Sequence, residues 1–178
     1  MDENKVKLEN MYRPGGKKYV HVNDNRILKI GKEYIEYLKS LAQKDSSGKC
    51  MMCLHNDIRA NMHEMIFVFP AGAYIRPHSH LTKTETTIVI EGKLLEVIFD
   101  DNGDILDKYV IDKDGIFTTR IDKGVIHTQI PLTDVIFYES KPGPFTGKDD
   151  SIFPEWAPGV DDETGIRKIM DQINSDKK

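Results

Sequence analysis

The stretch of sequence that decides the fold is residues 72–92, GAYIRPHSHLTKTETTIVIEG. Within it His78 and His80 are two positions apart, so on a β-strand both imidazoles leave the same face and can converge on one ion. Residues 81–84 are expected to form a turn that brings Glu85 back at the start of the next strand. This stretch therefore predicts two strands that carry two histidines and a carboxylate to one place.

A third imidazole, that of His127, lies on a predicted strand at residues 125–130, after the turn Asp122-Lys123-Gly124. A single histidine is more often a packed or surface residue than a ligand, but half of the six histidines fall on this pattern. Three imidazoles and one carboxylate suit one divalent transition ion (Fe, Mn, Ni or Zn) and leave positions for water or substrate. The predicted metal ligands are His78, His80, Glu85 and His127.

The sequence around this pattern consists of short runs of β-branched and aromatic residues between turns, which is typical of an all-β barrel or sandwich. An amphipathic helix is predicted from Ile30 to residues 45–48, and a short helix from Asp161 to Ile173, with acidic residues at its start. The expected strands are residues 50–55, 63–69, 74–78, 85–90, 94–99, 106–111, 115–120, 125–130 and 135–140.

The chain length of 178 residues fits one domain, and 39% hydrophobic with 30% charged residues is ordinary for a folded protein. We expect an irregular N-terminal arm at residues 1–29, with a short strand at residues 18–22. The main domain is expected at residues 30–158, ending in a packed proline-rich tail. Residues 159–178 are expected to form a C-terminal helical tail.

The net charge of −4 comes with scattered Lys and Arg residues, which argues against nucleic acid as a partner. No apolar run approaches the roughly 20 residues of a membrane helix, and the N-terminus lacks the apolar segment of a signal peptide. A cytoplasmic protein without membrane contact is therefore expected. Cys50 and Cys53 are three positions apart on a predicted strand, so they should face opposite sides and be buried residues rather than a redox or zinc pair.

The spacing Gly72, His78, His80, Glu85, Gly92 matches the first cupin motif, G-x5-H-x-H-x4-E-x6-G, at every fixed position. The resemblance implies a double-stranded β-helix, or jelly-roll barrel, in which these His and Glu residues and a later His hold a metal. The second motif is looser. Gly115, Gly124 and His127 can be matched, but Asp122 stands in place of a proline and Pro131 in place of an asparagine.

A narrower resemblance covers roughly residues 31–158 and rests on the leading helix and four stretches after it. These stretches are the strand CLH at residues 53–55, PHSH at 77–80, ESKPGPF at 139–145 and WAP at 156–158. The order is similar to the WbuC-like cupin-fold metalloproteins, a family associated with bacterial surface-polysaccharide gene clusters. The resemblance implies a role in polysaccharide metabolism but names no reaction.

Strand parity identifies further residues near the predicted ion. Tyr74 and Arg76 share a face with His78, and Gln129 shares one with His127, so these three are candidate substrate-binding residues. An inward Arg76 would suit a carboxylate or phosphate on the ligand, although it could equally reach the barrel mouth or pair with an acid. His55 is a candidate proton donor, or else a packed strand residue.

Three functions remain open on this sequence. The first is a metal-dependent enzyme acting on a small-molecule substrate such as a sugar or nucleotide-sugar, with isomerase or epimerase chemistry. The second is an Fe(II)-dependent dioxygenase, because a ferrous ion with open positions binds substrate and dioxygen together. The third is a ligand-binding or sensing module without turnover. A homodimer is also left open.

Overall fold

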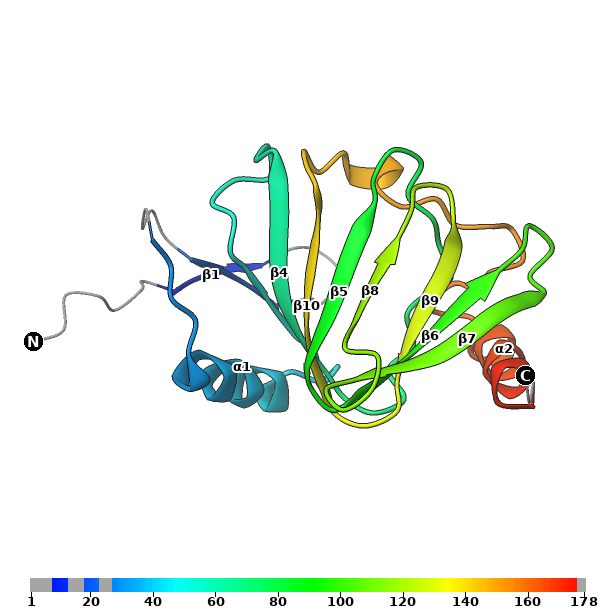
Figure 1. The fold of residues 1–178 in the computed structure, drawn as a ribbon. Helices are drawn as coiled ribbons and strands as arrows, with labels where there is room; N and C mark the ends of the chain where they lie inside the picture. Colours follow the sequence, from blue (N-terminus) through cyan, green and yellow to red (C-terminus); the bar gives the residue numbers. More distant parts are fainter. Residues whose placement is uncertain (1–7, 13–17, 23–26, 176–178) are drawn as a thin grey trace, which may run out of the picture.

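The computed structural model describes residues 8–12, 18–22 and 27–175, and within these ranges the chain forms two β-sheets and two α-helices. One sheet has seven strands in the order β1-β2-β3-β4-β10-β5-β8, and the other has three in the order β7-β6-β9 (Figure 1). The strands are β1 (Leu8–Tyr12), β2 (Lys18–Val22), β3 (Cys50–Cys53), β4 (Met62–Phe69), β5 (Glu85–Glu91), β6 (Lys93–Phe99), β7 (Ile105–Asp112), β8 (Thr118–Ile121), β9 (Ile126–Pro131) and β10 (Val135–Pro142).

The two sheets face each other across a shared apolar core. Phe67 and Phe137 from the seven-stranded sheet pack in one cluster with Leu94 and Ile111 from the three-stranded sheet. Except for β2 with β3, every strand pair is antiparallel. Two facing sheets of this kind make a jelly roll. The predicted all-β fold is therefore confirmed.

Helix α1 (Lys32–Lys44) covers the outer face of β3, β4 and β10 (Figure 1). Its buried residues Ile35, Leu38 and Ala42 pack on a cluster that includes Cys50 and Met52. Burial of a leucine-sized side chain stabilises the fold by about 1.5–3 kcal/mol. Met51 and Cys53 instead enter the core between the sheets. The two cysteines thus face opposite sides of β3, as their odd spacing predicts.

Helix α2 (Glu163–Ser175) covers the outer face of the smaller sheet, where Ile169 and Ile173 pack on Val97, Phe99 and Ile130 (Figure 1). Both predicted helices are therefore confirmed, although α1 begins two residues after Ile30 and α2 ends two residues after Ile173.

Two predicted segments differ from the structure. Residues 74–77 do not form a regular strand, and only His78 and Ser79 make isolated bridges there, because Pro77 has no N–H to contribute to a ladder. The N-terminal arm contains the expected β2, but also β1, which pairs with it. The sequence of β1 has no alternation to reveal it. The parts of the predicted arm at residues 1–7, 13–17 and 23–26 lie outside the described residues.

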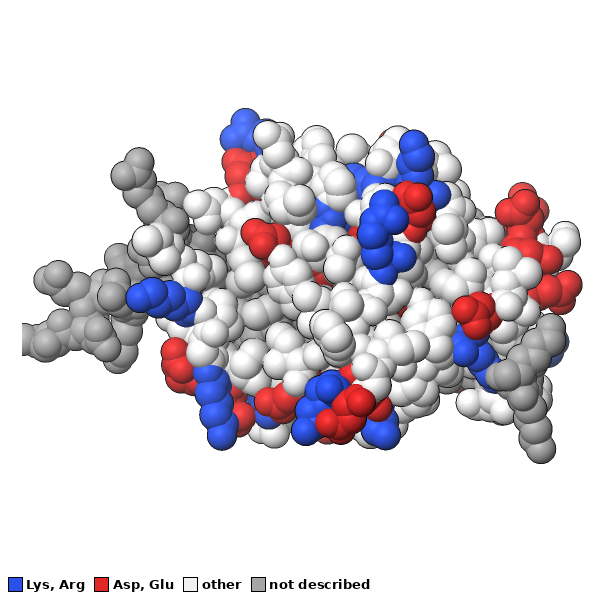
Figure 2. Space-filling view, in the orientation of Figure 1, with Lys and Arg blue, Asp and Glu red and all other residues white. Residues whose placement is uncertain are grey.

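The surface carries both signs of charge. Lys and Arg are interspersed with Asp and Glu on the face in Figure 2, with uncharged surface between them. Across the described part of the chain, no helix is long and apolar enough to cross a membrane.

Candidate metal centre

The segment around His78 extends the smaller sheet beyond β9. The backbone N–H of His78 donates to the carbonyl of His127 at 3.0 Å, and that of His127 donates back at 2.9 Å. The N–H of Gly124 donates to the carbonyl of His80 at 2.8 Å, and Gly124 has a φ of 81° that favours glycine. These bonds bring the first histidine pair beside the third histidine.

Glu85 approaches from the facing sheet, as the first residue of β5. Its Oε1 lies 2.8 Å from Nε2 of His127, and its Oε2 lies 3.0 Å from Nε2 of His80. The His78 ring is close as well, with its centroid 4.7 Å from that of His127. His80, Glu85 and His127 are only 2%, 3% and 1% exposed. The structure thus brings all four predicted ligands together in a buried cluster.

The second ring nitrogen of each histidine is held by the backbone. In all three rings Nδ1 lies at hydrogen-bond distance from a carbonyl oxygen, which can only accept, so Nδ1 carries a proton. The acceptors are the carbonyl of Arg76 for His78 at 2.9 Å, that of Val125 for His127 at 3.0 Å and that of Asp150 for His80. Metal-binding histidines are commonly oriented in this way by their second nitrogen.

This arrangement leaves Nε2 as the nitrogen that faces Glu85. In a neutral ring with a proton on Nδ1, Nε2 has only a lone pair, and a carboxylate also only accepts. The short contacts from His80 and His127 to Glu85 therefore require a proton on Nε2 or a cation shared between nitrogen and oxygen. The cluster is built to surround positive charge.

The pKa shifts agree with that electrostatic picture. Burial alone would raise the pKa of Glu85, but the hydrogen bonds with His127 and His80 lower it well below its usual value. Burial alone would lower the pKa of His127, but the Glu85 carboxylate raises it to about 9. Burial and the charge on His127 lower the pKa of His78 to about 3. Without a metal, His127 therefore carries a positive charge at pH 7, and His78 is neutral.

The donor atoms are in hydrogen-bond contact rather than at coordination spacing. Within the described ranges, no group of three or more His, Cys, Asp or Glu side chains is already spaced to hold a metal ion. Metal to nitrogen bonds of roughly 2.0–2.1 Å would require the Nε2 and carboxylate atoms to separate around the ion. The donor set itself, three imidazole nitrogens and one carboxylate, fits a divalent transition metal.

A cavity of about 380 Å³ opens beside the cluster, between the two sheets and the C-terminal tail. All three predicted substrate-binding residues line it, together with three of the four predicted ligands. The lining consists of Lys49, Phe67, Phe69, Tyr74, Ile75, Arg76, His78, Glu85, His127, Gln129, Phe137, Glu139, Lys141, Ser151, Phe153 and Val160.

Two of the predicted substrate-binding residues also hold the tail. The Tyr74 hydroxyl donates to the carbonyl of Pro158 at 2.8 Å, and Arg76 donates through Nε and Nη2 to the carbonyl of Ala157 at 3.1 and 2.9 Å. The third, Gln129, forms its hydrogen bonds with core residues instead. Strand parity was thus a good guide to the cavity, but not to the tail contacts.

Gln129 belongs to a small polar group in the core. Its Nε2 donates to Thr87 Oγ1 and to Glu96 Oε2, both at 3.0 Å. Glu96 is fully buried, and its Oε1 has no partner among the described residues. Burial raises the pKa of Glu96 to about 8. Glu96 is therefore mostly protonated at neutral pH. The signal in the sequence was its position two residues after Leu94, which places this glutamate on the inward face of the strand.

His55, the candidate proton donor, is not among the residues that line the cavity. Its ring stacks on that of His63, with centroids 4.0 Å apart, and its Nδ1 accepts a hydrogen bond from the N–H of Glu64 at 3.1 Å. This environment matches the packed-residue alternative for His55. A catalytic role for His55 stays a prediction.

Sequence reasoning did not identify a buried group of charges behind the cluster. Lys141 Nζ lies 3.2 Å from Glu139 Oε1, 3.5 Å from His80 Nε2 and 4.0 Å from Glu85 Oε2. Asp150 lies 3.9 Å from Lys141 and also pairs with the buried Lys83. Glu139 and Lys141 lie two and four residues after the core residue Phe137 on β10, so they share its inward face. This spacing was the signal in the sequence.

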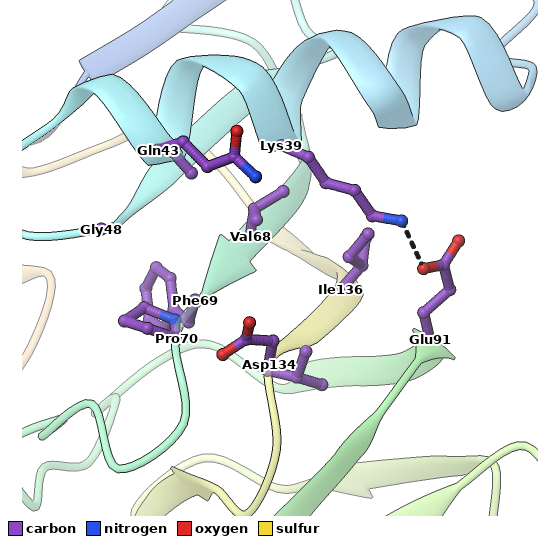
Figure 3. Close-up of a pocket in the computed structure, with 11 residues that line it drawn as sticks. Lys39, Gln43, Gly48, Val68, Phe69, Pro70, Glu91, Asp134 and Ile136 are labelled. Atoms are coloured by element: carbon purple, nitrogen blue, oxygen red, sulfur yellow. Dashed lines mark hydrogen bonds and ion pairs between the residues drawn. The ribbon is translucent and has the colours of Figure 1, made fainter.

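A second cavity, of about 420 Å³, lies outside the barrel between α1 and the ends of β4 and β10. In Figure 3, Lys39 reaches across it to Glu91, and their charged groups are 2.7 Å apart. The Asp134 carboxylate at its edge accepts a hydrogen bond from the N–H of Ala71. Its lining includes no histidine, so this cavity offers no comparable set of metal donors.

The two facing sheets form a jelly roll, and the spacing of the histidines and the glutamate at residues 72–92 resembles that of cupins. A family model described as a domain of unknown function, DUF6016, matches residues 30–111. No curated protein matches the chain in sequence.

Three of the solved structures with partial similarity to this chain are proteins with different described roles. Recombinant oxalate oxidase in complex with glycolate is 21% identical, with a TM-score of 0.46, over 61% of this chain and 56% of that one. The capsular polysaccharide assembling protein CapF from Staphylococcus aureus is 19% identical, with a TM-score of 0.46, over 59% and 34%. The Schizosaccharomyces pombe Cnp3 cupin domain is 14% identical, with a TM-score of 0.44, over 53% and 64%. The chain therefore spans less than two thirds of each of them.

Proposed function

We propose that this protein is a metal-dependent cupin enzyme that acts on a small polar substrate such as a sugar or nucleotide-sugar, with isomerase or epimerase chemistry. One divalent transition ion would be held by Glu85 and by Nε2 of His78, His80 and His127. The observation that carries the proposal is the backbone hydrogen bond at every Nδ1, because it leaves Nε2 of all three rings for a metal, with two of these atoms already in contact with the Glu85 carboxylate. The resemblance to WbuC-like proteins supports the role in polysaccharide metabolism.

The ion would supply a Lewis acid that polarises a carbonyl or hydroxyl oxygen of the substrate. Side chains of the cavity would exclude water and balance charge around the ion. The phenyl rings of Phe67 and Phe137 exclude water from one wall of the cavity. The Lys141 ammonium, 3.2 Å from Glu139, balances charge behind the ligands and fixes that second carboxyl group.

Glu139 is the residue we assign to proton transfer. Burial raises its pKa, which the ammonium of Lys141 opposes, so the carboxyl group can hold a proton more readily than an exposed glutamate. Glu139 lines the cavity but does not contact the three histidines through any recorded ion pair. Isomerisation needs a group that removes a proton from one atom and returns it to another, and a positioned carboxylate can do both.

The experiment is a metal and substrate screen on the purified full chain. Protein loaded with Mn²⁺, Fe²⁺, Ni²⁺ or Zn²⁺ is incubated with sugars and nucleotide-sugars in D₂O, and deuterium incorporation into substrate carbon is measured by mass spectrometry. We expect incorporation that depends on the metal and is lost in Glu139→Gln. Oxygen consumption with Fe²⁺ would indicate a dioxygenase instead, and ligand binding without any product would indicate a sensing module.

A further inference from the structure

The cavity is lined by more positive than negative side chains. The two carboxylates are both held by protein partners: Glu85 contacts two imidazoles, and Glu139 lies 3.2 Å from the ammonium of Lys141. Three cationic side chains line the same cavity and outnumber the two carboxylates, namely Lys49, Arg76 and Lys141. A divalent ion on the ligand cluster would add further positive charge. The cavity therefore favours a ligand that carries a negative charge.

Arg76 is the cation placed to bind such a ligand. Its guanidinium uses Nε and one Nη2 proton on the carbonyl of Ala157 and stacks on the Phe153 ring, 4.5 Å from its centroid. Among the described residues, no carboxylate lies within 4.0 Å of it. A guanidinium has five N–H donors in a planar fork. Its Nη1 edge thus remains available for a bidentate contact with a carboxylate.

The opposite sheet offers a flat apolar wall. Phe67 and Phe137 stack with their centroids 4.8 Å apart and their planes 15° apart, and Phe69 meets Phe137 edge-on at 5.6 Å. All three rings line the cavity. Aromatic walls of this kind pack against the face of a ring, in either a sugar or an aromatic compound.

A carboxylate fits this cavity better than a phosphate group. Phosphate sites are usually formed by successive backbone N–H groups in glycine-rich turns or at helix N-termini. None of the residues that line this cavity is a glycine, and none belongs to α1 or α2. The volume of about 380 Å³ is near the lower end of the roughly 300–1,000 Å³ typical of ligand sites.

We propose that the cavity binds a small cyclic carboxylic acid, with its carboxylate on the Nη1 edge of Arg76 and its ring against Phe67 and Phe137. This inference rests on the proposed function in one respect, because both place the ligand in the same cavity. It narrows the substrate class from polar compounds to acids, and it makes Arg76 a specificity residue.

The experiment compares acids with neutral analogues of the same shape. Binding of glucuronate and glucose, and of benzoate and benzamide, is measured by calorimetry on the full chain, both metal-free and after zinc addition. The variants are Arg76→Gln, which removes the charge and keeps an N–H donor for Ala157, and Trp156→Phe, which removes a tail contact to the carbonyl of Asp101 outside the cavity and leaves the charge. The two acids distinguish a sugar ring from an aromatic one.

We expect at least one acid to bind about tenfold more tightly than its neutral analogue, a difference of about 1.4 kcal/mol. Arg76→Gln should lose this preference, and Trp156→Phe should keep it. Equal binding of acid and neutral compound, unchanged acid binding in Arg76→Gln, equal losses in both variants, or no binding of either acid would each overturn the inference. Zinc uptake is recorded separately, so a failure of the metal site is recognised independently of the acid measurement.

Discussion

Among the side chains that the structure describes, buried histidines form two groups, and the groups differ in the partners of their ring nitrogens. In the metal cluster, Nδ1 of each ring lies against a carbonyl oxygen, and Nε2 of His80 and His127 faces Glu85. In the other group, the stacked rings of His55 and His63, Nδ1 of His55 accepts from a backbone N–H and Nε2 of His63 donates to the carbonyl of Ile58. Both groups are buried, but only in the first do ring nitrogens of two histidines contact one shared carboxylate.

This difference shows that burial and clustering alone do not make a metal site. The stacked pair satisfies the backbone of the loop before β4, which is a structural task. The metal cluster uses the backbone to fix the rings and keeps its second nitrogens for a shared charge. Substitutions in the two groups should therefore separate metal affinity from stability.

The largest effect is expected from removing the first two ligands. The double substitution His78→Ala with His80→Ala should abolish stoichiometric metal binding, because it removes two of the four proposed ligands. The loss should exceed the roughly 10–100-fold that is typical of a residue that only orients a ligand. Metal content by mass spectrometry and circular dichroism would be measured on the same sample. A folded double variant that retains one ion per chain would show that the ion lies elsewhere.

Replacing His127 should have the next largest effect. His127→Ala removes one of two contacts to Glu85 but leaves His80 in place, so we expect metal affinity to fall by more than about a hundredfold, beyond the loss typical of an orienting residue, without vanishing. Competition with a chelator of known affinity gives the value. An affinity equal to that of the unmodified protein would remove His127 from the ligand set.

Metal affinity should fall as the pH is lowered. The pKa of His127 is raised to about 9 in the metal-free protein, so at pH 7 the ion must displace its proton, whereas His78, with a pKa of about 3, is already neutral. We expect affinity to drop by about tenfold per pH unit between roughly pH 8 and pH 5. Zinc titrations in buffers of different ionisation enthalpy would count the released proton. A pH-independent affinity would contradict the assigned charge.

The smallest effect on metal binding is expected from the stacked pair. His55→Ala and His63→Ala should leave affinity unchanged and destabilise the fold by about 1–3 kcal/mol, since each ring is buried and hydrogen-bonded. Burial lowers the pKa of His63, so its contribution to stability is present above its ordinary pKa of about 6.5 and is lost as the pH falls below it. Urea unfolding with and without zinc checks both points. A loss of affinity in either variant would end the distinction between the groups.

The sequence was informative where the chemistry is local. His78, His80 and Glu85 lie within eight residues, so strand and turn geometry alone predicts that they meet. Gly92 is required for a similar local reason, because its φ is 84° and a Cβ would lie 2.2 Å from the carbonyl of Asp134. Both helices and the all-β character followed from periodicity, and the jelly roll was what the resemblance to cupins implied.

The sequence was less informative where partners are far apart in the chain. The carbonyl that orients His80 belongs to Asp150, 70 residues later, in a loop without periodicity. Lys141 reaches Glu85 only because β10 pairs with β5, and no local pattern gives that pairing. The segment before His78 was assigned to a strand because it alternates, but its polar groups bond to the tail instead.

The central claim is that the three imidazoles offer Nε2, and not Nδ1, to a metal ion, and nitrogen-detected NMR of the histidine rings tests it most directly. In the full chain, zinc should leave the Nδ1 protons of His78, His80 and His127 in place and shift their Nε2 resonances, while the rings of His55 and His63 stay unchanged. Zinc-dependent shifts at Nδ1, or at His55 and His63 alone, would contradict the account.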